Sequence, residues 1–158
     1  MGERQGVLSI QDSLPTHHQK RAMKSNEFDL QSDMAPIPFE LRHCLAAERL
    51  KGAGLPWKPH VGCFVWDKSG AIEAPSPFPH NIYFILNLNR FLSIFGTIEE
   101  IEAKLVWLPT WYQARLLCSK LAIPLNHSNR SDEPISPEDE LLELYEAVRS
   151  HLMGHHRT

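Results

Sequence analysis

Hydrophobic residues recur at helical spacing in several parts of the chain, which predicts amphipathic helices there. The first such segment buries Leu41, Leu45 and Leu50 on one side and ends at Gly52, where glycine can close a helix. The predicted helices cover residues 39–51, 90–95, 98–108, 111–122 and 137–153. Three or four of them are expected to pack against a sheet.

Capping residues mark the starts of three of these helices. Thr97 with Glu100 and Thr110 with Gln113 have the spacing of a capping box, in which two side chains satisfy backbone N–H groups reciprocally. Ser136 precedes a proline at the first helical position, where proline removes no needed donor. These polar side chains predict where the helices begin.

Residues 60–66 predict a buried β-strand, because they are rich in β-branched and aromatic side chains. Both faces are apolar, with Val65 on one face and Trp66 on the other, so the strand should be covered on two sides. The sequence DKSG at Asp67–Gly70 is a tight-turn signal. Residues 71–74 are therefore expected to return as the second strand of a hairpin.

A third strand is expected at residues 82–88, where apolar side chains alternate along the chain. The alternating prolines Pro75, Pro77 and Pro79 precede it and exclude a helix at that point. The same residues also fit the start of a helix, because periodicity does not separate the two structures in a short apolar run. We favour the strand.

These elements predict one α+β domain over residues 35–153. A small antiparallel sheet, made of the hairpin around Asp67–Gly70 and the third strand, packs against three or four helices. Residues 1–34 form a polar N-terminal arm that is largely extended or flexible, and residues 154–158 form a C-terminal tail.

Composition and charge argue against several classes of protein. The 158 residues are 42% hydrophobic and 22% charged, as in soluble globular domains. The net charge is −3, so the chain lacks the basic excess of nucleic-acid-binding proteins. No apolar run reaches the roughly 20 residues of a membrane span, so no membrane is expected. Three scattered cysteines predict reduced thiols and a cytoplasmic location.

Cys63 is the residue that a thiol enzyme would use, with His60 or His80 as its base. His60 and Cys63 are three residues apart, so on one strand they point to opposite faces. Cys63 instead shares a face with Val61 and Val65, which is typical of an inert buried thiol. The sequence favours a structural Cys63 but leaves open whether the protein is an enzyme.

No cofactor and no metal site is predicted. The sequence lacks the glycine-rich nucleotide motifs, the GxSxG nucleophile motif and the HExxH zinc motif. His43 and Cys44 are adjacent, and neighbours on a helix diverge by about 100°, so they form a poor chelating pair.

The aromatic stretch at residues 105–118, LVWLPTWYQARLLC, predicts either a ligand-holding cluster or a corner between two packed helices. Trp111 shares a helical stripe with Ala114 and Cys118, which favours the core. In this interpretation Trp107 closes the preceding helix. Arg115 lies beside the stripe, where its charged head can reach water.

The favoured function is a non-catalytic protein-binding or regulatory module that contacts another protein or a second copy of itself. Its contact residues are expected among the aromatic, histidine and arginine side chains. They are Trp57, Phe78, His80, Trp107, Trp111, Tyr112 and Arg115. The alternative is a small-molecule enzyme or ligand-binding protein with a pocket between the sheet and the 107–115 helix corner.

Overall fold

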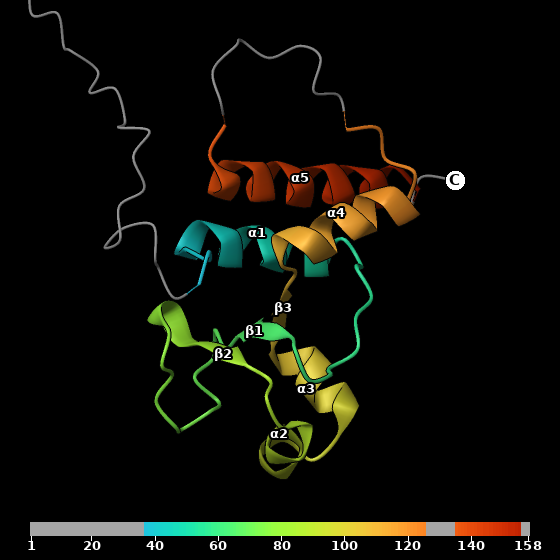
Figure 1. Cartoon of the computed structure of the whole chain (residues 1–158). Coiled ribbons are helices and arrows are strands. Elements are labelled where there is room, and N and C mark those ends of the chain that lie inside the picture. Colours follow the sequence, from blue (N-terminus) through green and yellow to red (C-terminus); the bar gives the residue numbers. More distant parts are fainter. Residues whose placement is uncertain (1–36, 126–134, 156–158) are drawn as a thin grey trace, which may run out of the picture. The chain divides into compact units, whose positions relative to one another are not determined.

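The computed structural model describes residues 37–125 and 135–155 and has the predicted α+β architecture (Figure 1). The helices are α1 (Leu41–Gly52), α2 (Leu88–Phe95), α3 (Ile98–Lys104), α4 (Trp111–Lys120) and α5 (Pro137–His155). The strands are β1 (Phe64–Trp66), β2 (Ile82–Phe84) and β3 (Val106–Leu108), and a 3₁₀ turn, η1 (Pro79–Asn81), precedes β2. Within these residues, no helix has the length and apolar character needed to cross a bilayer.

The sheet consists of three short antiparallel strands in the order β2-β1-β3. Phe64 of the central strand β1 lies opposite Phe84 of β2 and Leu108 of β3. Successive side chains of a strand point to opposite faces, so Phe64 and Trp66 share one face and Val65 points to the other. Because β1 pairs on both sides, the sheet depends on this strand.

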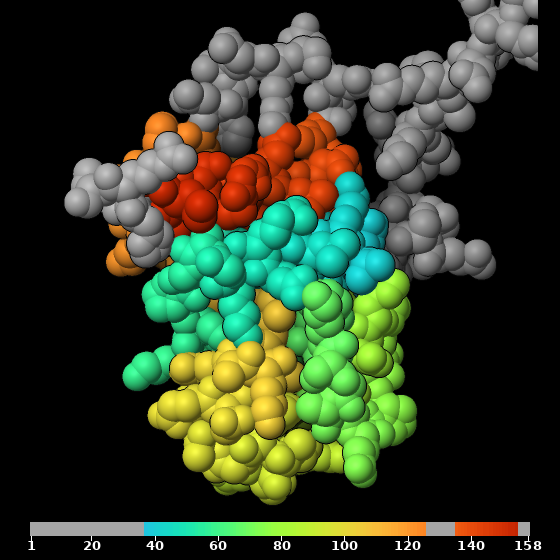
Figure 2. Space-filling model, turned by 180° about the vertical axis from the view of Figure 1, so that it is seen from behind, coloured from blue at the N-terminus to red at the C-terminus, as the bar shows by residue number. Residues whose placement is uncertain are grey.

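Helices cover both faces of the sheet. On one face, Trp66 and Leu108 pack with buried residues of α1, α4 and α5. On the other face, Cys63 and Val65 pack with buried residues of α2 and α3. Figure 1 shows these two groups of helices on opposite sides of the sheet, and Figure 2 shows α1 (cyan) beside α5 (red). The prediction that β1 is covered on two sides is confirmed.

Side-chain caps begin three helices as predicted. Thr97 Oγ1 accepts a 3.2 Å hydrogen bond from the N–H of Glu100 at the start of α3. The capping box of α4 is complete, because Thr110 Oγ1 accepts from the N–H of Gln113 at 3.3 Å and Gln113 Oε1 accepts from the N–H of Thr110 at 2.9 Å. Ser136 Oγ accepts a 3.1 Å bond from the first turn of α5.

The hairpin predicted around Asp67–Gly70 does not form, because residues 71–74 are not a strand. The carboxylate of Asp67 is buried and accepts a 2.8 Å hydrogen bond from the N–H of Ile72. The hydroxyl of Tyr83 donates to a backbone carbonyl of the same loop at 2.7 Å. These side chains hold the segment as a loop, and β1 pairs with the more distant strands β2 and β3 instead.

The strand predicted at residues 82–88 is confirmed only for its first three residues. β2 ends at Phe84, and α2 begins at Leu88. The side chain of Asn87 accepts a 3.0 Å hydrogen bond from the N–H of Asn89 and so caps α2. Of the predicted segment, residues 82–84 therefore form a strand, and only its last residue, Leu88, belongs to a helix.

Residues 106–108 form β3, although the sequence predicted that a helix continues through them. Lys51 Nζ donates to the carbonyl oxygens of Ala103 at 2.6 Å and Leu105 at 3.0 Å, which satisfies carbonyls at the end of α3. The chain then extends and pairs with β1. The predicted 107–115 helix corner is thus a corner between a strand and a helix.

The last helix was predicted to end before Gly154, but α5 continues through this residue to His155. The predicted tail at 154–158 therefore loses its first two residues to the helix, and residues 156–158 lie outside the described part of the chain. The predicted arm at 1–34 also lies outside it. The domain boundaries stay predictions.

Candidate functional site

The residues predicted for a functional site lie in four places rather than one. They are His60 with Cys63 before β1, Phe78 and His80 at η1, Trp57 with Trp107, and Trp111, Tyr112 and Arg115 on α4. The pocket predicted for the alternative function required several of these groups to converge. Each place is therefore considered by its own geometry.

His60 and Cys63 are in contact, so the prediction that they point to opposite faces is wrong. A turn closed by a 3.2 Å hydrogen bond from the N–H of Cys63 to the carbonyl of His60 precedes β1. Gly62 has a φ of 101° in this turn, a conformation that glycine adopts without steric cost. The turn brings His60 Nδ1 to 3.2 Å from Cys63 Sγ. The sequence argument failed because residues 60–63 are a turn and not a strand.

The His60–Cys63 pair does not have the properties of an activated thiol. Cys63 is fully buried, and burial raises the pKa of its thiol above the ordinary value, although a backbone hydrogen bond at His60 lowers it in part. His60 Nδ1 also lies 3.0 Å from the carbonyl oxygen of Lys58. A carbonyl oxygen only accepts hydrogen bonds, so it favours a proton on Nδ1, and Nδ1 is then not free to take the proton of the Cys63 thiol. A protonated thiol is a weak nucleophile at neutral pH. This geometry supports the structural interpretation of Cys63.

His80 lies at the opposite end of β1 from this pair. The N–H of Asp67 donates to the carbonyl of Asn81 at 3.0 Å, whereas the N–H of Ile85 donates to the carbonyl of Cys63 at 2.9 Å. The four steps from Cys63 to Asp67 span about 13 Å at the rise of a strand. His80 is exposed, with a φ of 62°, and the structure does not bring it to the thiol.

Phe78 belongs to the core rather than to a contact surface. It is half-buried, and its ring makes an edge-to-face contact with Phe64 at a centroid distance of 6.0 Å. Its backbone N–H donates to Ser76 Oγ at 3.0 Å. These contacts fix the proline-rich segment against the sheet.

Trp57 and Trp107 form a stacked pair. Their ring centroids are 6.3 Å apart, and the planes differ by 12°. Both side chains pack against the hydrophobic cluster formed with α2 and α3. The indole Nε1 of Trp107 is buried and has no hydrogen-bond partner among the described residues. An unpaired buried donor is uncommon and directs attention to the space around the pair.

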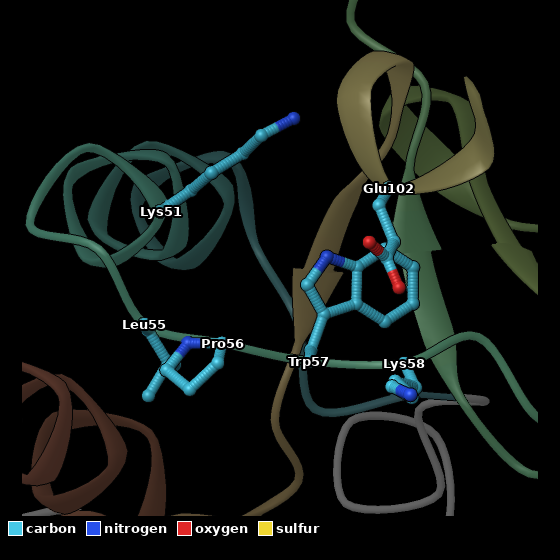
Figure 3. Close-up of a pocket in the computed structure, with 6 residues that line it drawn as sticks. All are labelled: Lys51, Leu55, Pro56, Trp57, Lys58 and Glu102. Carbon is cyan, nitrogen blue, oxygen red and sulfur yellow. The ribbon is translucent and has the colours of Figure 1, made fainter. Parts of the chain in front are cut away.

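A cavity of about 530 Å³ lies beside Trp57 (Figure 3). Its lining comes from the end of α1, the loop that follows α1, and α3. The lining residues are Lys51, Leu55, Pro56, Trp57, Lys58 and Glu102. Of the residues predicted from sequence only Trp57 lines it, so the cavity lies elsewhere than between the sheet and the 107–115 corner. Glu102 was not singled out from the sequence, because a carboxylate in the first turns of a helix is common and indicates no site by itself.

The outward side of α4 exposes a second group of predicted residues. Trp111 is 41% exposed, Tyr112 70% and Leu116 43%, whereas Ala114 and Cys118 of the same helix are buried. The prediction that Trp111 belongs to the core stripe is therefore wrong. We call Trp111, Tyr112 and Leu116 the α4 surface.

Arg115 explains why Trp111 stays outside the core. Its guanidinium carbon lies 4.7 Å from the centroid of the Trp111 ring, in cation–π geometry. The Nη2 atom of Arg115 also forms a 2.7 Å ion pair with Glu140 of α5. The tryptophan is thus covered in part by a charged group that α5 holds.

Within residues 37–125 and 135–155, no three His, Cys, Asp or Glu side chains are grouped so that they could hold a metal ion. Comparisons of the chain with protein-family models, with curated proteins and with solved structures gave no match. Inference of function therefore depends on the surfaces and cavities of this chain.

Proposed function

We propose that this protein is a non-catalytic binding module that contacts another protein, or a second copy of itself, through the α4 surface. The observation that carries the proposal is the exposure of Tyr112 beside Trp111 and Leu116 on one side of a short helix. Tyrosine and tryptophan are enriched at the centres of protein interfaces because each buries a large apolar area and offers a polar group.

The order of this surface also supports a binding role. The ion pair with Glu140 and the ring of Trp111 hold Arg115 in place before any partner arrives. Side chains that are ordered in advance lose less conformational entropy on binding. Arginine and tryptophan are residue types that often contribute most of the binding energy at an interface.

The chemistry of the cysteines and histidines supports a non-catalytic role. Burial raises the pKa of the Cys44, Cys63 and Cys118 thiols, so none of them resembles an activated nucleophile. All three cysteines are free, which fits the reducing cytoplasm that we propose as the location.

Site-specific photocrosslinking in the native host tests the proposal. A photoreactive phenylalanine analogue replaces Tyr112 in one variant and the exposed Glu73, on a different part of the surface, in a matched control. We expect an adduct of defined mass at position 112 that Leu116→Glu removes, and no such adduct at position 73. The mass of the adduct separates a second copy from another protein.

Two results contradict the proposal. One is the absence of an adduct at position 112, and the other is an adduct of equal yield at both positions. Sedimentation velocity of the purified chain complements this test, since self-association through the α4 surface should be weakened by Leu116→Glu.

A further inference from the structure

The cavity beside Trp57 has the features of a small-molecule site, independently of the α4 surface. Its volume of about 530 Å³ lies within the range of roughly 300–1,000 Å³ that ligand pockets occupy. The lining combines an aromatic and aliphatic part with three charged side chains. Figure 3 shows Trp57 in the middle of the group, with Lys51 extending from α1 and Glu102 from α3.

The stacked tryptophans provide a fixed aromatic plane. Trp107 covers one face of the Trp57 ring at a nearly parallel angle of 12°, and Trp57 itself lines the cavity. Leu55 and Pro56 extend the apolar part of the lining. Aromatic rings favour offset-stacked partners, so this plane suits a flat ligand ring.

The charges of the lining favour an anion. Lys51 and Lys58 outnumber the single carboxylate of Glu102, which gives the lining a net charge of +1. The ammonium group of Lys51 has three N–H donors, of which the carbonyls of Ala103 and Leu105 take two. The third N–H of this ammonium group is not used by these two bonds, and the bonds hold the nitrogen in position.

The side chains of Lys58 and Glu102 have no hydrogen-bond or ion-pair partner among the residues that the structure describes, so both are available to a ligand. A carboxylate or other anion can accept from Lys58, whereas the ammonium of Lys51 lies on the other side of the Trp57 ring in Figure 3 and contributes its positive charge to the lining. Glu102 is an acceptor and requires a donor on the same ligand. A cationic ligand would gain from the Trp57 ring but would be repelled by two ammonium groups, so the observations favour an anion.

We propose that this cavity binds a planar aromatic monocarboxylate that also carries a hydrogen-bond donor on its ring. The ring stacks on Trp57, the carboxylate pairs with Lys58, and the ring donor bonds to Glu102. The chemical class follows from the plane, the net charge and the single acceptor of the lining.

Titration of the ¹⁵N-labelled full chain followed by NMR tests this inference. The probe is 6-hydroxy-2-naphthoate, and the readout is the indole N–H signal of Trp57, which Trp57→Phe identifies. Two comparison compounds lack one feature each: 2-naphthoate lacks the donor, and 2-naphthol lacks the carboxylate. We expect a saturable shift of the Trp57 signal with the probe, and binding that is weaker with either comparison compound.

Two variants and a matched control localise the binding. Lys58→Glu should weaken the binding of 6-hydroxy-2-naphthoate and of 2-naphthoate by about fivefold or more, because an exposed charge contributes modestly to affinity. The affinity for 2-naphthol should stay within about twofold. Glu102→Met should remove the preference for the hydroxylated probe. Lys120→Glu makes the same charge change at the exposed end of α4. It should alter neither the affinity for the two naphthoates nor the preference for the hydroxylated probe.

The inference is overturned if the Trp57 signal does not shift, or if Lys58→Glu and Lys120→Glu affect binding equally. The amide spectrum of each variant reports in the same experiment whether the chain is folded, so loss of binding is not confused with unfolding. Neither result depends on the α4 surface.

Discussion

The imidazole Nε2 of His43 lies 3.0 Å from the backbone carbonyl oxygen of Glu138 and joins α1 to the first turn of α5. Nδ1 of the same ring accepts a 2.9 Å hydrogen bond from the N–H of Glu40. The neutral tautomer with the proton on Nε2 satisfies both bonds. Arg42 adds a 2.5 Å ion pair to Asp139, so consecutive residues of α1 hold consecutive residues of α5.

Replacing this buried histidine should destabilise the domain. His43→Leu leaves the N–H of Glu40 without a partner and removes the side-chain hydrogen bond to the carbonyl of Glu138, which should lower the free energy of unfolding by about 2–3 kcal/mol. Urea unfolding followed by circular dichroism measures the change. His60→Leu, at an exposed histidine, is the control and should cost about 0.5 kcal/mol or less. Equal costs at both positions would refute the role given to His43.

Stability should fall in alkali because the folded domain keeps protons that the unfolded chain loses. Burial raises the pKa of Cys44 from 9.0 to about 11, and it raises the pKa of Tyr145 well above its ordinary value of 10. The stabilisation from Cys44 is fully present below pH 9 and is lost as the pH rises towards 11. The loss from Cys44 should reach at most about 2–3 kcal/mol.

Denaturant unfolding at a series of pH values measures this alkaline loss. Cys44→Ala should make the decline above pH 9 shallower, because one of the groups whose pKa is raised by folding is gone. Cys118→Ala should do the same to a smaller degree, since burial raises the pKa of that thiol as well. A decline that is unchanged in Cys44→Ala would contradict the assignment.

The turn between His60 and Cys63 depends on Gly62. Its φ of 101° is strained for any L-residue with a side chain, while no atom lies within 4 Å of the position where a Cβ would be. Gly62→Ala should therefore cost about 1–2 kcal/mol through backbone strain alone. Thermal or urea unfolding measures the cost. Gly52→Ala, at the helical end of α1 and equally free of neighbours, should be neutral or stabilising.

All three thiols should react slowly in the folded protein, because each is buried and each has a raised pKa. Timed alkylation at neutral pH, followed by peptide mass spectrometry, measures the three rates separately. Full reaction is expected only after denaturation. Selective reaction of Cys63 in the folded state would instead support the thiol-enzyme alternative, with His60 as its base.

Asn81→Gly should stabilise the turn that leads into β2. His80 and Asn81 have φ values of 62° and 58°, and the N–H of Ile82 bonds to the carbonyl of Pro79 across them. This is the geometry of a type I′ turn, which favours glycine at its second central position. The gain should be about 0.5–1 kcal/mol in the free energy of unfolding. Asn89→Gly, inside α2, should have the opposite sign.

Local sequence signals determined the helix starts and the two-sided burial of β1. Thr97, Thr110 and Ser136 bond backbone N–H groups within three residues, so their effect needs no distant partner. The continuous apolar run around Val65 also acts within the strand, since side-chain direction follows from backbone geometry alone. These features were predicted correctly for that reason.

Tertiary structure decided which strands pair. The DKSG turn signal predicted a local hairpin. Instead, the carboxylate of Asp67 accepts a hydrogen bond from the loop that follows it, and β1 pairs with the segments at residues 82–84 and 106–108. Pairing across such separations is decided by how the whole core packs, and short segments carry little intrinsic preference for it. The same is true of residues 106–108, whose local pattern fits the end of a helix.

In the candidate sites, too, the sequence indicated some features and the tertiary structure decided the others. The exposed aromatic residues of α4 were recognised by type, but only the packing of α4 against α5 determined that Trp111 faces outward beneath Arg115. The cavity beside Trp57 was not predicted, because it brings Glu102 of α3 together with Lys51 and Lys58, which belong to a distant segment of the sequence. Sequence determines which chemical groups a chain has, and the long-range contacts of the core determine which of them meet.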